Sequence, residues 1–320
     1  MRAIFPTTGR MMGRRRKSGK AVNGWIILDK PGGMTSTSAV GAVRRLLDAN
    51  KAGHAGTLDP MATGVLPIAL GEATKTLPYV VDTTKRYRFT LRWGVATATD
   101  DREGEVIEKC ALRPSKAAIV AALPSFRGVI QQVPPIYSAK KVDGQRAYDL
   151  ARRGEDVTLA PQAIRVDRFE LDEICDADHA IFSVVSGKGA YMRGLARDLA
   201  LSLGTVGHLV ELRRTAVGPF EETHAISLDE MAANGQSPAA SDCLLPVETP
   251  LDDIPALALT EQEAGRLRNG QAVSLIRKVD LERISAFADG ETVLATAMGR
   301  PVALSRYSAG EVRPVRVLNL

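Results

Sequence analysis

Apolar and polar residues alternate most clearly between residues 86 and 93. One side of this segment is aromatic and aliphatic and the other is mainly cationic: the first holds Tyr87, Phe89, Leu91 and Trp93, and the second holds Arg86, Arg88, Thr90 and Arg92. A period of two is typical of a strand that is buried on one face only. The pattern therefore predicts a strand with a core side and a basic side. Apolar runs at residues 25–28 and 180–186 predict two further strands.

Helices are predicted where a capping residue precedes apolar residues spaced three or four apart. One follows Thr35-Ser36, one runs from Ser115 to just before Pro124, and one starts near Tyr191 and ends before Gly204. Hydroxyl groups at a helix start accept hydrogen bonds from the free N–H groups of the first turn. Glycine readily takes the left-handed conformation that ends a helix.

Composition divides the chain into four parts. The first twenty residues carry seven cations and no acid, so residues 1–22 are predicted to form a disordered basic arm. Residues 23–236 hold the main series of strands and helices, and residues 237–256 are rich in proline and acids, as a linker is. Residues 257–320 are expected to form a small, mostly β domain.

Two local signals shape the expected C-terminal domain. Thr260 and Glu263 have the spacing of a capping box, and Asn269-Gly270 is placed to end the helix that follows. Asp289-Gly290 lies between two alternating segments, so we expect a hairpin turn joining strands at residues 284–287 and 292–295.

Charge and residue counts restrict the class of protein. A net charge of +5 is a mild indication of a polyanionic partner. The three cysteines and four histidines are scattered, so we expect neither disulfides nor a metal site. Charged residues interrupt every apolar segment, so no membrane span is expected and a cytoplasmic location fits best.

Residues 131–154 have the composition of a binding loop. The segment contains two adjacent prolines, few core residues and many cations. The candidate phosphate contacts are Lys140, Lys141, Arg146, Arg152 and Arg153.

The most specific motif runs from residue 53 to residue 75 and contains Asp59-Pro60. Proline disfavours helical torsions at the residue before it, while Gly53, Gly56 and Gly64 allow tight backbone paths nearby. A single Asp-Pro step is usually only a turn. The complete segment, however, resembles the signature of the bacterial TruB-type tRNA pseudouridine-55 synthases.

The resemblance extends over residues 24–225 and includes blocks in the family's order. They are Lys30-Pro31 with Thr35-Ser36, Lys85-Arg86-Tyr87, the segment 133–139, the segment 186–193 and Leu212-Arg213-Arg214. It implies an α+β catalytic domain with a mixed, largely antiparallel sheet and flanking helices. Residues 257–320 resemble, more weakly, the PUA-type RNA-binding module that many members carry.

The resemblance also implies three catalytic residues. Asp59 is the implied nucleophile, Tyr87 the aromatic residue that packs on the target base, and Arg193 the cation paired with the aspartate. Tyr87 could instead be a core aromatic and Arg193 a surface charge. A cation at a helix N-terminus opposes the helix dipole, however, so Arg193 requires a compensating anion.

Further positions match those that the family uses around its substrate, namely His54, Tyr191 and Leu212. Structural alternatives are a turn histidine for His54 and plain core for Leu212. Lys30, before a glycine-rich turn, is a further candidate RNA contact, although helix capping also explains this turn.

The implied activity is conversion of uridine 55 in the T loop of tRNA to pseudouridine, on a nucleotide turned out of its stack. The isomerisation adds and removes no atom, so we expect no cofactor and no obligatory protein partner. Two alternatives remain open: a non-catalytic tRNA-binding or assembly protein on the same scaffold, and a base-excising hydrolase.

Overall fold

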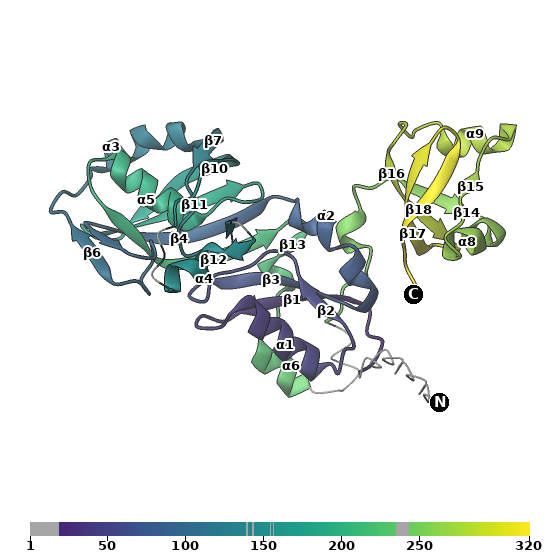
Figure 1. Cartoon of the computed structure of the whole chain (residues 1–320), viewed down its shortest axis with the longest axis horizontal. Helices are drawn as coiled ribbons and strands as arrows, with labels where there is room; N and C mark the ends of the chain where they lie inside the picture. The colour runs from purple at the N-terminus through teal and green to yellow at the C-terminus, as the bar shows by residue number, and fades with distance from the viewer. Residues whose placement is uncertain (1–18, 139, 143, 154, 156, 235–242) are drawn as a thin grey trace, which may run out of the picture.

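The computed structural model describes residues 19–320 apart from residues 139, 143, 154, 156 and 235–242 (Figure 1). Of the arm predicted over residues 1–22, residues 1–18 lie outside the described residues. Lys20 forms an isolated bridge with Ala49, and Val22 packs against the main core, so the last residues of this segment belong to the folded domain.

Within the described residues, nine strands form the large sheet of the first domain. The central path has the order β1-β3-β12-β4-β11-β10-β7, while β2 pairs with β3 and β13 pairs with β12. The strands are β1 (Gly24–Lys30), β2 (Ala52–His54), β3 (Thr63–Leu70), β4 (Lys85–Trp93), β7 (Gly128–Gln132), β10 (Gln162–Ile174), β11 (His179–Ser186), β12 (Gly207–Val217) and β13 (Phe220–Glu221). β3 and β12 are parallel and the other pairs are antiparallel. The predicted mixed, largely antiparallel sheet is confirmed.

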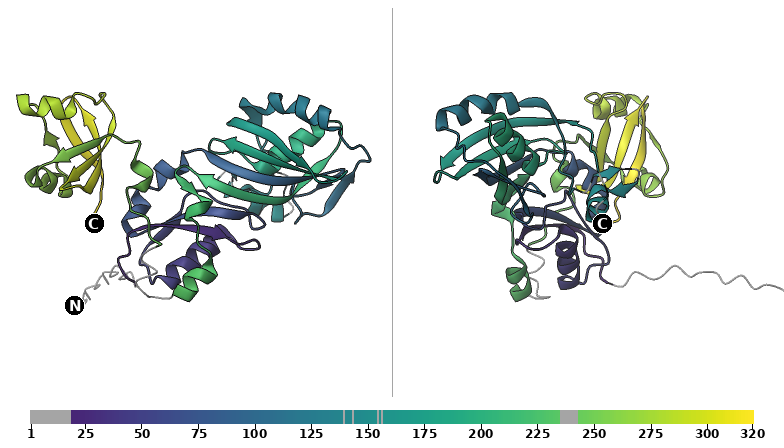
Figure 2. Two further views of the ribbon diagram at one scale, coloured as in Figure 1. Left: turned by 180° about the vertical axis from the view of Figure 1, so that it is seen from behind. Right: turned by 60° about the vertical axis from the view of Figure 1, so that its left-hand side comes forward.

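Helices flank this sheet. They are α1 (Ser36–Leu46), α2 (Leu77–Val81), α3 (Lys116–Ala122), α5 (Met192–Ser202) and α6 (Leu228–Asn234), with 3-10 turns η1 (Gly71–Lys75), η2 (Leu123–Phe126), η3 (Glu222–His224) and η4 (Thr249–Leu251). The predicted caps of α1 and α3 are confirmed, because Thr35 accepts from Ser38 N and Ser115 accepts from Ala118 N. α1 and α6 lie side by side below β1 (Figures 1 and 2).

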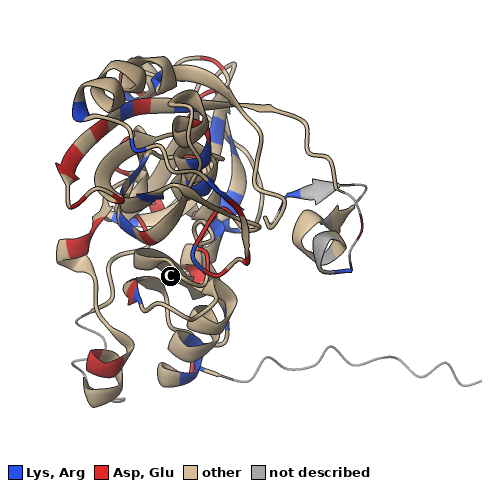
Figure 3. Cartoon of the chain, turned by 90° about the vertical axis from the view of Figure 1, so that its left-hand side faces the viewer, with Lys and Arg blue, Asp and Glu red and all other residues tan. Residues whose placement is uncertain are grey.

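The alternation in β4 has the predicted effect on burial. Phe89, Leu91 and Trp93 are buried in the main core. On the opposite face, Arg86 pairs with Glu221 at 2.6 Å and Arg88 lies 3.7 Å from Asp172. Cations and acids are interspersed over this domain (Figure 3), and two of the three arginines on this side of β4 lie next to an acid.

The second domain holds a five-stranded sheet in the order β14-β16-β17-β18-β15 within the described residues. Its elements are β14 (Ala256–Leu259), α8 (Glu261–Arg268), β15 (Val273–Ser274), α9 (Lys278–Ile284), β16 (Thr292–Ala297), β17 (Arg300–Ser308) and β18 (Glu311–Val317). The predicted capping box of Thr260 and Glu263 is present at the start of α8, and Gly270 follows its end with a φ of 77°.

The predicted hairpin turn at Asp289-Gly290 is wrong, because its first strand does not form. Helix α9 ends at Ile284, where the expected strand would begin, and residues 285–287 form no strand. The buried Asp280 carboxylate accepts a hydrogen bond from Arg277 N at 3.2 Å at the start of this helix. Short apolar segments do not distinguish a helix from a strand. β16 turns instead into β17 at Met298-Gly299, where both residues have positive φ.

Part of the predicted linker is attached to the first domain. Leu245 pairs with Trp25 of β1, and Trp25 Nε1 donates to the carbonyl oxygen of Val247 at 3.3 Å. Leu304 and Leu318 of the second domain belong to the same buried cluster as Trp25. The two domains therefore share a small apolar contact, although they are distinct bodies in Figure 2.

Gly64 allows the parallel contact between β3 and β12. It has a φ of 98°, and a Cβ there would lie 2.2 Å from the backbone oxygen of Arg214. We therefore expect Gly64→Ala to lower the free energy of unfolding by about 3 kcal/mol or more, measured by urea unfolding. Gly265→Ala in α8 is the control, because open space surrounds that position. It should leave stability unchanged or raise it by up to about 1 kcal/mol, and equal effects of the two substitutions would contradict this interpretation.

Candidate active site

Asp59 lies in the loop that enters β3, at the parallel junction of the large sheet. The residue before it is held by helix α1: Ser36 Oγ accepts from Leu58 N at 2.8 Å and donates to Leu58 O at 3.0 Å. The residue after it is also held, because Pro60 O accepts from Gly33 N at 2.8 Å. The sequence blocks around residues 30–36 and 53–75 thus converge to fix the backbone that carries Asp59.

Lys30 lies behind this loop rather than at an RNA-contacting surface. Its side chain is fully buried, and Nζ donates to the carbonyl oxygens of Pro31, Met34 and Pro60 at 2.8, 2.7 and 3.2 Å. Burial lowers the pKa of Lys30 to about 8, against the opposing effect of the Asp59 charge. The structure therefore corrects the expected RNA contact: Lys30 supports the backbone next to Asp59.

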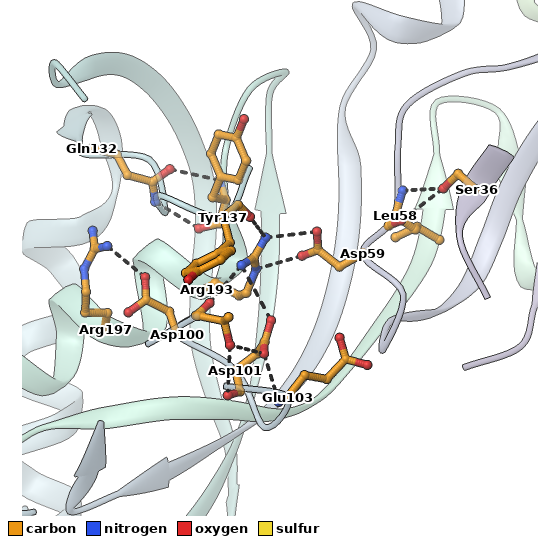
Figure 4. A network of polar contacts seen from close by, with 12 residues as sticks. Ser36, Leu58, Asp59, Asp100, Asp101, Glu103, Gln132, Tyr137, Arg193 and Arg197 are labelled. Carbon is orange, nitrogen blue, oxygen red and sulfur yellow. Dashed lines mark hydrogen bonds and ion pairs between the residues drawn. The ribbon is translucent and has the colours of Figure 1, made fainter. Parts of the chain in front are cut away.

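Arg193 binds the Asp59 carboxylate through both arms of its guanidinium (Figure 4). Nε lies 2.8 Å from Oδ2 and Nη2 lies 3.0 Å from Oδ1. The Arg193 side chain is 4% exposed and the Asp59 side chain 31%, so the carboxylate is partly accessible to solvent while the cation is buried. Because Arg193 is in the first turn of α5, the predicted need for a compensating anion is met.

Arg193 has a second acidic partner that sequence reasoning missed. Its Nη1 lies 3.5 Å from Asp101 Oδ2, and the Asp101 side chain is 5% exposed. Nη1 also donates to Thr99 O at 2.8 Å, and Nη2 donates to Tyr137 O at 2.9 Å. A buried guanidinium requires such a complete set of acceptors. The only signal in the sequence was the adjacent acids at residues 100 and 101, on a turn with no recognised motif.

Tyr87 lies on β4, next to the strand that carries Arg214. Arg214 is 1% exposed, and its guanidinium donates to the carbonyl oxygens of Val65 and Gly56 at 2.8 and 3.0 Å. Burial lowers the pKa of Arg214, and its interaction with the Tyr87 hydroxyl opposes that shift. Arg214, from the Leu212-Arg213-Arg214 block of the sequence, therefore connects the Asp59 loop to Tyr87.

The other expected substrate contacts differ in their surroundings. His54 ends β2; burial lowers its pKa, and among the described residues its buried Nδ1 has no hydrogen-bond partner. Tyr191 is the N-cap residue of α5, and its backbone forms two hydrogen bonds with the Gln132 side chain at 2.9 and 3.0 Å. Leu212 is 6% exposed in the main core, opposite Phe89.

The cationic segment at residues 131–154 has regular structure of its own. It contains β8 (Lys141–Val142), β9 (Gln145–Arg146) and α4 (Ala147–Arg152). Lys140 Nζ donates to Gln162 Oε1 at 2.8 Å, and Arg153 Nε donates to Glu155 Oε1 at 2.6 Å. The side chains of the remaining predicted contacts, Lys141, Arg146 and Arg152, lie outside the described residues.

Two kinds of feature are absent from the described part of the chain. No three His, Cys, Asp or Glu side chains there come together as metal ligands would. None of its helices has the length and apolar character needed to cross a membrane.

Family models match most of the first domain. The model described as TruB family pseudouridylate synthase, N-terminal domain, matches residues 44–192. The model described as tRNA pseudouridylate synthase B C-terminal domain matches residues 193–252. The chain belongs to the TruB family. The boundary between the two models falls beside Arg193, so the Asp59–Arg193 pair joins both family regions.

Curated relatives agree with this TruB assignment over nearly the whole chain. The tRNA pseudouridine synthase B of Gluconacetobacter diazotrophicus is 56% identical over 307 residues, covering 95% of this chain and 100% of the relative. That of Rhodospirillum rubrum is 54% identical over 306 residues, covering 96% and 99%. That of Caulobacter vibrioides is 50% identical over 307 residues, covering 96% and 99%.

Solved structures support the TruB fold at lower identity. A Cbf5-Nop10-Gar1 complex matches with a TM-score of 0.68 and 24% identity, covering 92% of this chain and 84% of that one. An H/ACA RNP bound to a substrate RNA containing 2'-deoxyuridine matches with a TM-score of 0.70 and 21% identity, covering 97% and 93%.

The buried Lys30 makes stability depend on pH. Below about pH 8 it is charged in both the folded and the unfolded state, so the full cost of burying the charge is present. Between about pH 8 and its ordinary value of 10.5, the unfolded chain binds more protons, so stability rises with pH. The free energy of unfolding of the wild type minus that of Lys30→Met should therefore increase by about 1–2 kcal/mol from about pH 7 to about pH 9.5.

Urea unfolding of both proteins at the two pH values measures this difference. Lys85, whose pKa burial also lowers to about 8, is present in both proteins and cancels. Parallel pH profiles would show that the Lys30 environment is not as described.

Proposed function

We propose that this TruB-family protein is a cytoplasmic tRNA pseudouridine synthase that isomerises uridine 55 in the T arm. The observation that carries the proposal is one carboxylate within the motif, Asp59, which is partly exposed to solvent and is bound through two hydrogen bonds by a buried arginine. The relatives named tRNA pseudouridine synthase B, at 50–56% identity over nearly their whole length, support the substrate class.

The reaction requires one carboxylate. The C–N glycosidic bond breaks, the uracil turns while it stays bound, and its C5 joins the same sugar carbon. Asp59 either attacks that carbon or stabilises a cationic sugar. Arg193 favours the ionised form of Asp59 that both routes need.

The second acid of the site is not placed as a general acid or base. Glycoside hydrolases generally use two carboxylates, one of which protonates the leaving group. Asp101 is buried, lies against Arg193 and accepts hydrogen bonds from Thr99 Oγ1 at 2.5 Å and Glu103 N at 3.0 Å. This occupation favours isomerisation over hydrolysis.

Tyr87 is the proposed aromatic partner of the base. Tyr87 packs at the edge of the main core and is only partly buried, so part of the residue is accessible to a uracil. Its hydroxyl, which interacts with Arg214, is a candidate to move the proton from C5.

RNA binding in this proposal combines base extrusion with a phosphate clamp. An enzyme that acts on a stacked nucleotide first turns it out, and His54, at the end of β2, is the candidate to occupy the vacated space. The 131–154 segment supplies phosphate contacts, and the C-terminal domain is the candidate PUA-like RNA-binding module. Affinity should therefore fall as salt rises.

The direct test is incubation of the purified protein with uridine-containing tRNA transcript and mapping of pseudouridine. Wild type should modify position 55, and Asp59→Asn should bind the transcript with similar affinity but reduce product formation by at least about a thousandfold. Asp176→Asn, at an exposed turn distant in sequence from the site, should retain activity.

The products separate the alternatives. Free uracil with an abasic RNA would identify a base-excising hydrolase. Binding without any product in the wild type would identify a non-catalytic tRNA-binding protein.

A further inference from the structure

A second arginine of α5, Arg197, makes contacts that the proposed chemistry does not use (Figure 4). Its Nη1 donates to Asp100 Oδ2 at 2.9 Å, its Nη2 to Val133 O at 2.8 Å, and its Nε to Asp198 Oδ1 at 2.9 Å. The side chains of Arg197 and Asp100 are 23% and 17% exposed. Charge-assisted hydrogen bonds in such a partly buried place are stronger than those of an open surface pair.

Arg197 lies one helical turn after Arg193, and the two arginines bind the same two segments. Both pair with the turn at Asp100-Asp101, each with a different carboxylate. Both also donate to the segment that follows β7, at the carbonyl oxygens of Val133 and Tyr137. Residues four apart face the same side of a helix. One face of α5 therefore binds both the Asp100-Asp101 turn and the segment after β7, through Arg193 and again through Arg197 one helical turn later.

Gln132 provides a third attachment of this segment to α5. Its side chain donates to Tyr191 O at 3.0 Å and accepts from Tyr191 N at 2.9 Å. Gly194 makes room for it, because a Cβ there would lie 2.9 Å from Gln132 Nε2. Residues 132–137, which we call the loop root, are thus held to α5 before the chain continues into β8, β9 and α4.

The loop root and the nucleophile share one nitrogen of Arg193. Arg193 Nη2 donates both to Tyr137 O in the root and to Asp59 Oδ1. This contact does not involve Arg197, so the Asp59–Arg193 pair stays in place when Arg197 is replaced. Arg197 holds the root four residues earlier, at Val133, and makes no hydrogen bond to Asp59 among the described residues.

We propose that Arg197 is a positioning residue for RNA binding: paired with Asp100, it fixes the loop root through Val133 and so places the cationic 131–154 segment relative to Asp59. This inference rests on the proposed function. Arginine suits the task because its planar fork reaches three acceptors in fixed directions, which the single ammonium group of lysine does not.

The test compares kcat and KM for tRNA transcript in the wild type, Arg197→Lys, Asp100→Asn and the double variant. Asp100 has a φ of 60°, a conformation that asparagine tolerates, so Asp100→Asn removes the charge without new backbone strain. Each single variant should raise KM about tenfold and leave kcat within about twofold. The double variant should be no worse than the single ones, because both substitutions break one connection.

Arg113→Lys is the matched control. Arg113 also joins an aspartate and a carbonyl, donating to Asp178 Oδ1 at 2.6 Å and to Cys110 O at 2.8 Å, but on a different loop. It should leave KM unchanged. Thermal unfolding of all variants shows whether a KM change only follows general destabilisation.

Three results would overturn the inference. The first is an unchanged KM in Arg197→Lys. This result is expected if Arg197 only contacts a phosphate, because lysine can bind a phosphate as well. Additive losses in the double variant are the second, and an equal rise in KM for Arg113→Lys is the third. If the wild type itself forms no pseudouridine, the proposed function fails instead. The dissociation constants for tRNA then decide the role of Arg197: they should rise in both single variants, rise no further in the double variant and stay unchanged in Arg113→Lys.

Discussion

The ion pair between Arg193 and Asp59 is the interaction on which the arrangement of the first domain depends. A guanidinium that is only 4% exposed is costly to bury unless its donors find acceptors. The structure supplies two carboxylates and two carbonyl groups, contributed by the β3 entry loop, the turn after β5 (Val95–Thr97) and the loop root. Because one cation binds all three segments, the nucleophile, its electrostatic partner and the start of the RNA-binding segment are positioned together.

The sheet explains why this meeting point exists. The loop that carries Asp59 leads into β3 at the single parallel contact of the described large sheet. Gly64 allows the close approach of β12 there. Two buried cations bind the backbone of this loop: Lys30 donates to the carbonyl oxygen of Pro60, after Asp59, and Arg214 donates to that of Gly56, before it. The side chains that form hydrogen bonds with this loop, Ser36, Lys30, Arg193 and Arg214, are buried, whereas Asp59 is partly exposed. Substrate access and loop rigidity are thus provided by different residues.

Sequence reasoning succeeded where the cause is local or where a motif is long. Alternation identified β4, and hydroxyl caps identified the starts of α1 and α3. The helix dipole predicted that Arg193 needs a compensating anion, and the family resemblance implied that this anion is Asp59. It failed where the partner is distant in sequence. No spacing in the sequence encodes contacts that form only when separate segments pack together. Examples are those of Arg193 with Asp101 and Tyr137, and that of Arg197 with Val133. The glycine-rich turn before a helix predicts a phosphate contact near Lys30, whereas in the structure the Lys30 side chain is fully buried beneath the loop that carries Asp59. The short apolar run at residues 284–287 predicts a strand, whereas α9 ends at Ile284 and no strand follows it there, because so short a run does not fix its own structure.

The most direct test of the central ion pair is the single-turnover rate of Arg193→Lys on tRNA transcript, measured with saturating enzyme. Lysine keeps the charge but does not bind Asp59, Thr99 O and Tyr137 O together. The rate should fall by at least about a hundredfold, while the protein stays folded and binds the transcript. A rate equal to that of the wild type would show that Asp59 does not depend on the arginine behind it.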